Sequence, residues 1–262
     1  MPVIEKHPAG NFCWMELATS NQAAAKDFYT KLFAWTANDI PMGPADTYTM
    51  FQLDGLETAA AYAMRPEQQA QGVPPNWMVY VAVESADEVA ARAAQLGGEL
   101  IAPPFDVFDV GRMAVIKDPT GAMFSIWEAR KHIGSRVAGV SGTLCWADLN
   151  TPDPQRATEF YSQLFGWKLE AAEKDPSGYL HIRNGEHFIG GIPPATHRNP
   201  EAPAHWLAYV LSSDCDATAL AAKQMGAKFH LPPMTMEGVG RFAVVSDPQG
   251  AVFAIFQAMR PA

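Results

Sequence analysis

Two acidic side chains, Glu16 and Asp148, occupy matching places in two similar stretches of the sequence. Each follows a tryptophan by two residues, Trp14 in the first stretch and Trp146 in the second. Residues two apart on a strand lie on the same face, so each tryptophan shares a face with its carboxylate. A carboxylate on such an apolar wall has a raised pKa and is suited to act as a general base. A carboxylate at a strand end also commonly accepts a hydrogen bond or meets solvent, so both interpretations stay open.

Strand alternation places further side chains on the same faces as the two carboxylates. The ligand-binding candidates are Trp14, Tyr80, Ser125, Trp127, Trp146, His181 and Tyr209. Aromatic walls with few polar groups are typical of a small-molecule pocket, although the same rings could simply fill a core. His181 shares a strand face with Arg183, and the pair could hold an anion if that face lines the cavity. If it does not, the two side chains belong to a solvated surface.

Two further features recur in both halves of the chain. Arg112 and Arg241 each follow a glycine just before a predicted strand, which favours structural ion pairs over catalysis. We expect Asp118 and Asp247 to be their partners. Small residues on the inner strands, such as Gly190–Gly191, predict the close approach of a ligand or of another backbone.

These residues are positioned by a tandem repeat. GNFCWMEL (10–17) returns 132 residues later as GTLCWADL, and DPTGAMF (118–124) returns 129 residues later as DPQGAVF. Such extended self-similarity indicates two homologous halves of about 125 residues. We expect a first domain at 8–130, a linker at 131–140 and a second domain at 141–260.

Each half divides again into two units with the same order of elements. A strand at 12–17 precedes a helix, with Ser20 as the expected N-cap and Ala24, Phe28 and Leu32 as its buried stripe. Short strands follow, and a second strand–helix series repeats the order within the half. The order β-α-β-β-β predicts an α+β fold in which helices cover one face of a mostly antiparallel sheet.

The repeated motifs FYxxLFxW and GRxAVxxDPxGAxF, on a βαβββ order, resemble those of the vicinal-oxygen-chelate superfamily. This superfamily includes glyoxalase I, extradiol dioxygenases, fosfomycin-resistance enzymes and bleomycin-binding proteins. The two-domain form looks like the tandem glyoxalase-like proteins of bacteria, and the resemblance covers roughly residues 10–129 and 142–258. It implies two domains, each a pair of βαβββ modules that form a cupped mixed or antiparallel sheet with helices on the outer face.

The resemblance also implies where a divalent metal would bind, because the family's His and Glu ligands lie on particular strands. The positions that match them best in this sequence are Trp14, Met78 and Ser125 in the first half, and Trp146, Leu207 and Ala254 in the second. None of these is a His, Cys, Asp or Glu, whereas zinc, iron and manganese sites need three or more such donors. We therefore expect no metal site of the family's type and predict no cofactor.

Composition limits the partners and the compartment. The 262 residues carry a net charge of −9, which disfavours nucleic acid and anionic membranes as partners. Three cysteines without CxxC spacing argue against a disulfide scaffold, and alternation places Cys13 and Cys145 beneath the helices and Phe12 on the cavity face. The stretch MPVIEKHPAG lacks the pattern of a signal peptide, and no apolar run approaches ~18 residues, so we expect a cytoplasmic protein.

The leading hypothesis is a glyoxalase/bleomycin-resistance-like protein that binds a small aromatic or amphipathic molecule in a metal-free cup. The alternative is a lyase, isomerase or dioxygenase of the same superfamily with a divergent active site, in which Glu16 or Asp148 acts as the catalytic group. A third possibility is a structural or interaction protein. The chain is expected to be a monomer or a homodimer.

Overall fold

The computed structural model describes residues 3–43, 46–171 and 177–259. The first half of the chain forms the strands β1 (Phe12–Thr19), β2 (Thr36–Pro41), β3 (Thr47–Leu53), β4 (Leu56–Ala63), β5 (Asn76–Ala82), β6 (Glu99–Val107), β7 (Gly111–Lys117) and β8 (Met123–Ala129). Its helices are α1 (Gln22–Phe33), α2 (Pro66–Ala70) and α3 (Ala86–Gln95).

The second half repeats this order. Its strands are β9 (Leu144–Asn150), β10 (Lys168–Ala171), β11 (Leu180–Asn184), β12 (His187–Ile192), β13 (His205–Leu211), β14 (Lys228–Met236), β15 (Gly240–Ser246) and β16 (Val252–Ala258). Its helices are α4 (Pro154–Phe165) and α5 (Cys215–Gln224), with a short 3-10 turn η1 (Ala195–His197) where the first half has α2.

Each half of the chain builds one eight-stranded sheet. The strand orders are β2-β3-β4-β1-β5-β8-β7-β6 and β10-β11-β12-β9-β13-β16-β15-β14. β1 runs parallel to β4 and antiparallel to β5, while β5 runs parallel to β8. These mixed sheets with a helix in each module confirm the α+β fold that the sequence predicts.

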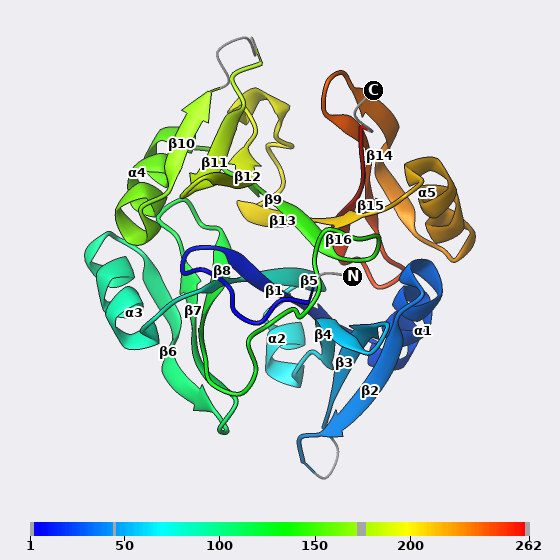
Figure 1. Ribbon diagram of the computed structural model, residues 1–262, viewed down its shortest axis with the longest axis horizontal. Coiled ribbons are helices and arrows are strands. Elements are labelled where there is room, and N and C mark those ends of the chain that lie inside the picture. Colours follow the sequence, from blue (N-terminus) through cyan, green and yellow to red (C-terminus); the bar gives the residue numbers. More distant parts are fainter. Residues whose placement is uncertain (1–2, 44–45, 172–176, 260–262) are drawn as a thin grey trace.

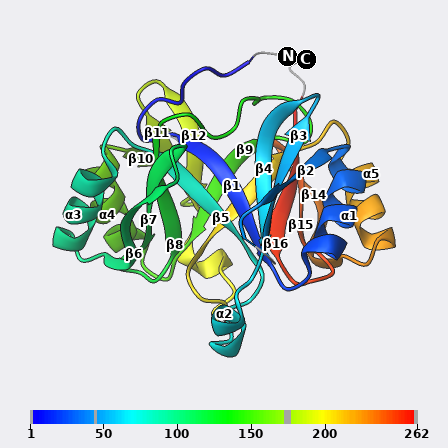
Figure 2. The ribbon, with the colours of Figure 1, turned by 90° about the horizontal axis from the view of Figure 1, so that it is seen from below.

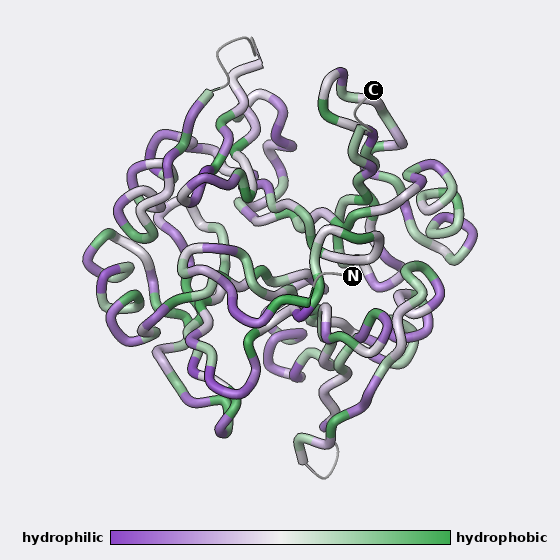
Figure 3. Tube along the Cα trace, viewed as in Figure 1, coloured by the Kyte–Doolittle hydropathy of each residue, from purple (hydrophilic) through white to green (hydrophobic). Residues whose placement is uncertain are grey.

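The two sheets are arched and lie back to back, so that their concave sides face away from each other (Figure 1). β5 contacts β13 where the sheets meet, and the helix pairs α1–α5 and α3–α4 pack together at the two sides. The largest buried cluster therefore lies between the convex sides of the sheets and under the helices. Hydrophilic positions are concentrated on the peripheral helices and hairpins (Figure 3). None of the helices in the described part of the chain is long and apolar enough to cross a membrane.

The repeated motifs join the two halves to each other. The Tyr29 hydroxyl on α1 donates to Asp247 Oδ2 at 2.9 Å, and the Tyr161 hydroxyl on α4 donates to Asp118 Oδ2 at 2.9 Å. These reciprocal bonds explain why the FY and DPxG motifs occur in both halves. The expectation that Asp118 and Asp247 pair with the repeated arginines is wrong.

The arginines form ion pairs, but each pair lies within its own half. Arg112 binds Asp87 at 2.8 Å and Asp106 at 2.9 Å, and Arg241 binds Asp216 at 2.5 Å. Asp87 and Asp216 lie near the start of α3 and of α5, so each arginine ties a strand to the helix that covers it. These contacts therefore support a structural role for the two arginines.

Two details of the first strand and helix differ from the expectation. Helix α1 is capped by Asn21 and not by Ser20, because the Asn21 side chain accepts from the amide of Ala24. A β-bulge between Phe12 and Trp14 reverses the alternation at the start of β1. Phe12 consequently packs in the core between the sheets, while Cys13 joins the concave cluster with Trp14.

Candidate functional site

The first concave face is the concave side of the first sheet, where Glu16 is held by two tyrosines. The Tyr48 hydroxyl donates to Glu16 Oε1 at 2.7 Å, and the Tyr80 hydroxyl donates to Glu16 Oε2 at 2.8 Å. Burial raises the pKa of Glu16, and the two tyrosine bonds and the charge of His132 partly offset this effect. Trp14 lies beside this carboxylate in a buried cluster with Tyr80 and Trp127.

The second concave face carries the matching network around Asp148. The Tyr209 hydroxyl donates to Asp148 Oδ2 at 2.7 Å, and the Tyr179 hydroxyl donates to Oδ1 at 2.5 Å. The Trp146 indole N–H lies 3.0 Å from Oδ1 and 2.9 Å from the Tyr179 hydroxyl oxygen. Burial raises the pKa of Asp148, and the hydrogen bonds from the tyrosines and Trp146 partly offset this effect.

The shorter carboxylate of the second concave face is matched by a smaller residue on the neighbouring strand. Asp148 lies beside Gly191 of β12, whereas Glu16 lies beside Ala60 of β4. A Cβ on Gly191 would stand 1.9 Å from the Tyr179 hydroxyl oxygen, so only glycine lets this tyrosine reach Asp148. A Cβ on the preceding Gly190 would stand 2.3 Å from a backbone oxygen of β9. Gly190 thus serves the close backbone approach that the pattern predicts, whereas Gly191 makes room for a side chain.

Tyr48 and Tyr179 are site residues that the sequence reasoning missed. Tyr48 lies on β3, and Tyr179 immediately precedes β11, the matching strand of the second half. The two tyrosines are 131 residues apart, close to the spacing of the repeat, and this match was the signal available. The spacing of these two tyrosines departs from that of the preceding motif because the loops before their strands differ in length between the halves.

The first concave face is covered by the chain itself. The connecting segment, residues 130–143, runs from β8 to β9 and crosses one end of the first sheet beside the N-terminal segment (Figure 2). The Ser135 amide donates to the Cys13 carbonyl at 2.7 Å. A Cβ on Gly134 would lie 2.4 Å from that carbonyl oxygen, which shows how closely the segment approaches β1.

His132 of this segment packs against the aromatic residues of the first concave face. Its ring lies edge-on to Trp14, with centroids 4.8 Å apart, and its centroid lies 5.8 Å from that of Trp127. His132 Nδ1 lies 3.0 Å from Glu57 Oε2, and the Trp127 indole N–H donates to the His132 carbonyl at 2.8 Å. The sequence placed His132 in the predicted linker and assigned it no role.

His181 lies on the second concave face, which resolves the alternative left open by the sequence. Its ring centroid is 6.3 Å from that of Trp146 and 5.0 Å from that of Tyr179. Arg183 does not join it, because its guanidinium binds Glu170 at 2.7 Å and the carbonyl of Gly185 at 3.0 Å. The anion site considered for His181 and Arg183 is therefore not formed by this pair.

Ser125 and the cysteines complete the set of candidates. Ser125 is fully buried on β8 beside Tyr80, and its hydroxyl has no hydrogen-bond partner in the described residues. The three cysteines are free thiols. Burial raises the pKa of Cys13, raises that of Cys145 to about 12 and raises that of Cys215 to about 11, so none is an activated nucleophile.

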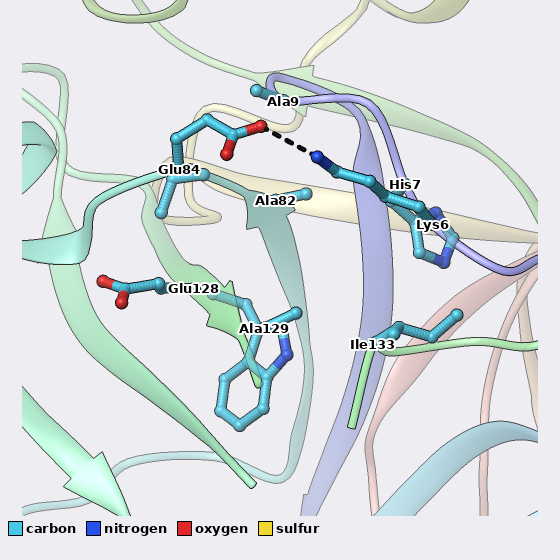
Figure 4. Close-up of a pocket in the computed structure, with 10 residues that line it drawn as sticks. Lys6, His7, Ala9, Ala82, Glu84, Glu128, Ala129 and Ile133 are labelled. Atoms are coloured by element: carbon cyan, nitrogen blue, oxygen red, sulfur yellow. Dashed lines mark hydrogen bonds and ion pairs between the residues drawn. The ribbon is translucent and has the colours of Figure 1, made fainter. Parts of the chain in front are cut away.

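A pocket of about 190 Å³ lies at the ends of β5 and β8, where residues of the N-terminal segment line it. Lys6 and His7 border it together with Glu84, Trp127 and Ile133 (Figure 4). The ion pair of Lys6 with Glu84, at 3.4 Å, spans this opening. Neither Glu16 nor Asp148 lines the pocket, so it is separate from the two carboxylate networks.

The side chains do not fit the divalent-metal centre that the resemblance implies. In the ranges 3–43, 46–171 and 177–259, no three His, Cys, Asp or Glu side chains gather in a group that could hold a metal ion. Glu16 instead accepts from tyrosine hydroxyls, and Asp148 accepts from tyrosine hydroxyls and an indole N–H, and these donors compete with a metal for the carboxylate lone pairs.

The comparisons with known proteins agree with this architecture. A family model described as "Glyoxalase/Bleomycin resistance protein/Dioxygenase superfamily" matches residues 11–126 and 143–255. The Mycobacterium tuberculosis protein named "Putative glyoxylase CFP32" is 39% identical over 261 residues, which cover 98% of each chain. The "Anthracycline biosynthesis protein DnrV" of Streptomyces peucetius is 33% identical over 258 residues, which cover 93% of this chain and 92% of DnrV.

Solved structures share the fold at much lower identity. The Mn(II)-bound glyoxalase from Novosphingobium aromaticivorans matches with a TM-score of 0.66 and 16% identity, covering 96% of this chain and 83% of that one. A catechol 2,3-dioxygenase matches with a TM-score of 0.64 and 14% identity, covering 98% of this chain and 90% of that one. The family model spans both sheets and the relatives align over nearly the whole length. The chain therefore belongs to the glyoxalase/bleomycin resistance protein/dioxygenase superfamily.

Proposed function

We propose that this protein binds a small aromatic or amphipathic molecule on its second concave face, without the metal that the family often uses. The observation that carries the proposal is the contrast between the two faces. In both, two tyrosines hold a carboxylate beside a tryptophan, but the connecting segment covers the first face. The first concave face then serves stability, and the second serves binding.

The second concave face offers one polar anchor within an aromatic surface. Asp148 Oδ1 accepts two hydrogen bonds and Oδ2 accepts one, so one of the about four acceptor positions of the carboxylate remains on Oδ2. A hydroxyl or amide N–H of a ligand can occupy that position. The adjacent rings of Trp146 and Tyr209 are only partly buried, which leaves apolar area for the rest of the ligand.

Apolar side chains extend this surface toward the edge of the second sheet. Phe242 and Phe256 lie opposite each other on β15 and β16, with ring centroids 6.2 and 6.5 Å from that of Tyr209. Met234 of β14 pairs with Phe242, and the side chains of Met234 and Met236 are both exposed. Methionine adapts to ligands of different shape, and exposed apolar patches commonly mark binding surfaces.

The experiment is a thermal-shift and tryptophan-fluorescence titration with neutral aromatic alcohols and amides, and with an anthracycline because of the name of DnrV. Tyr209→Phe and Tyr80→Phe form a matched pair, since each removes one hydroxyl from one carboxylate. We expect Tyr209→Phe to weaken binding about tenfold and Tyr80→Phe to leave it unchanged. Equal loss in both variants, or no response to any compound, would contradict the proposal.

The proposal includes binding without a metal, and the metal content of the protein tests this part separately. Protein purified without chelators is analysed for Mn, Fe, Ni and Zn, and the titration is repeated after chelator treatment. We expect less than stoichiometric metal and unchanged ligand affinity. A stoichiometric metal whose removal abolishes binding would overturn this part.

The raised pKa of Asp148 favours a second candidate, an enzyme in which this carboxylate accepts a proton from the substrate. Such an enzyme would be a lyase, isomerase or dioxygenase with a divergent site. Rates are measured on 2-oxoaldehyde–thiol adducts and catechols, with and without added divalent metals. Loss of a measured rate in Asp148→Asn, with ligand binding retained, would support the enzyme. Wild-type rates in that variant would remove Asp148 from the mechanism.

A further inference from the structure

The covered first concave face shows which kind of group fits this surface. His132 places a flat ring that bridges two aromatic residues of the sheet, Trp14 and Trp127. One edge of that ring meets the carboxylate of Glu57 at 3.0 Å. The first face is thus a protein-made example of an occupied cup, with a ring from the connecting segment as the occupant.

Strand register identifies the equivalent positions in the second half. Trp14 pairs with Tyr80 as Trp146 pairs with Tyr209, so the two tryptophans are equivalent. Trp127 corresponds to Phe256, because β5–β8 and β13–β16 pair in the same register: Ala82 with Trp127 and Leu211 with Phe256. Glu57 corresponds to Phe188, because Gln52 pairs with Glu57 as Arg183 pairs with Phe188.

The second half retains the two aromatic side chains that contact the ring in the first half, but not the carboxylate that pairs with it. Trp146 and Phe256 keep the two aromatic walls, whereas the partner carboxylate Glu57 is replaced by the Phe188 ring. Phe188 is 54% exposed, and in the described residues no ring contacts both Trp146 and Phe256. His181 lies between Trp146 and Phe188 on the side of Tyr179, and it belongs to the sheet itself.

We infer that the second concave face takes an uncharged, planar aromatic ring between Trp146, Phe256 and Phe188, at the place equivalent to that of His132. This inference rests on the proposed function and narrows its ligand class. A cationic ring is disfavoured at this place because Phe188 stands where Glu57 stands in the first half and has no charge to pair with it.

Benzamide and benzamidine test the inference, because they have nearly the same shape and differ in charge. Both are titrated into the full-length protein at pH 7, and the indole N–H resonance of Trp146, assigned with Trp146→Phe, is followed by NMR. The wild type is expected to bind benzamide more tightly than benzamidine. Phe188→Glu restores the carboxylate of the first face and is expected to tighten benzamidine binding by about fivefold.

The controls separate this inference from the proposed function. Phe188→Leu keeps an apolar side chain and should retain the preference for benzamide. Because Phe188 is exposed, the wild type, Phe188→Glu and Phe188→Leu are expected to have similar stability. An unchanged benzamide-to-benzamidine ratio in Phe188→Glu would overturn the ring placement, while other aromatic ligands that perturb Trp146 would leave the proposed function standing. No response of Trp146 to any aromatic compound would overturn both.

Discussion

The two concave faces hold their carboxylates in similar ways but differ in what covers them. In both, a carboxylate on the first strand accepts hydrogen bonds from two tyrosines beside a tryptophan. The first face is then closed by the connecting segment, which brings His132 against Trp14. The network itself is therefore compatible with both a structural and a binding role, and the covering segment decides between them.

The two faces also differ in the length of the carboxylate side chain and in the size of the residue beside it. The first face uses glutamate beside alanine, Glu16 and Ala60, and the second uses the shorter Asp148 beside Gly191. Length lost from the carboxylate is compensated by a tyrosine that sits deeper, in the space that an alanine methyl would fill. Each half is thus internally matched, and exchanging one member alone should disturb it.

The connecting segment approaches β1 closely at Gly134. We therefore expect Gly134→Ala to have the largest effect on the free energy of unfolding. Its φ is +96°, and the added Cβ would lie 2.4 Å from the backbone oxygen of Cys13. Left-handed strain and overpacking together should lower the free energy of unfolding by about 3 kcal/mol, measured by urea denaturation. Gly139→Ala is the matched control, since Gly139 has a φ of +71° in the same segment but no atom within 4 Å of its Cβ position. An equal loss in both variants would show that strain alone acts, and that the contact with β1 contributes nothing.

Gly191→Ala should break the second network while leaving the first intact. The new methyl would displace Tyr179 from Asp148, and we expect a loss of about 2 kcal/mol because a hydrogen bond to a buried carboxylate is removed. Ligand binding on the second concave face should weaken in parallel. Ala60→Gly in the first half is the control, since it adds space without a clash. Wild-type stability of Gly191→Ala would show that Tyr179 reaches Asp148 by another path.

Most of the fold follows from the sequence, because its signals are local and occur twice. The repeat and the order of its elements predict two α+β halves, and the sheets confirm them. The bulge at Cys13 was not predictable, since one inserted residue leaves no mark on a pattern of apolar residues. It reversed the expected faces of Phe12 and Cys13.

The site was predicted less completely than the fold. Glu16 and Asp148 with their tryptophans and Tyr80 and Tyr209 lie together as strand alternation indicates. His132 escaped notice, because a linker has no periodicity and its path depends on tertiary contacts. Glu57 lies on β4, and only its contact with His132 gives it a role. Interdomain partners such as Tyr29 and Asp247 escaped for the same reason, being 218 residues apart in the chain.

Removing the His132 ring should open the first face, and His132→Ala therefore tests the origin of the asymmetry. The variant loses the contacts with Trp14 and Trp127 and leaves Glu57 without its partner, so we expect a loss of about 1–2 kcal/mol. The Trp14 indole should also begin to respond to an added aromatic compound such as benzamidine, which can replace the imidazole beside Glu57. His187→Ala, at an exposed position, is the control for losing a histidine. A Trp14 resonance that stays silent in His132→Ala would mean that the backbone of the segment, and not the ring, closes this face.

The smallest expected effect is on the pH dependence of stability, and it compares the two carboxylates directly. Burial raises the pKa of Asp148 in the folded state, so the folded protein holds this proton over a pH range in which the unfolded chain has lost it. The stabilising contribution is therefore complete below the ordinary aspartate pKa and declines as pH rises through the folded-state value, with a slope of at most about 1.4 kcal/mol per pH unit. Asp148→Asn removes the titrating group, so the stability of the wild type relative to this variant should fall as the pH rises above the ordinary aspartate pKa, as measured by urea unfolding. Glu16→Gln should show the same sign, because burial also raises the pKa of Glu16. A difference that stays constant with pH in Asp148→Asn would mean that the tyrosine and tryptophan donors fully offset burial on the second concave face. The pKa of Asp148 in the folded protein would then equal its ordinary value, and the idea that burial strengthens this carboxylate as a base would be overturned.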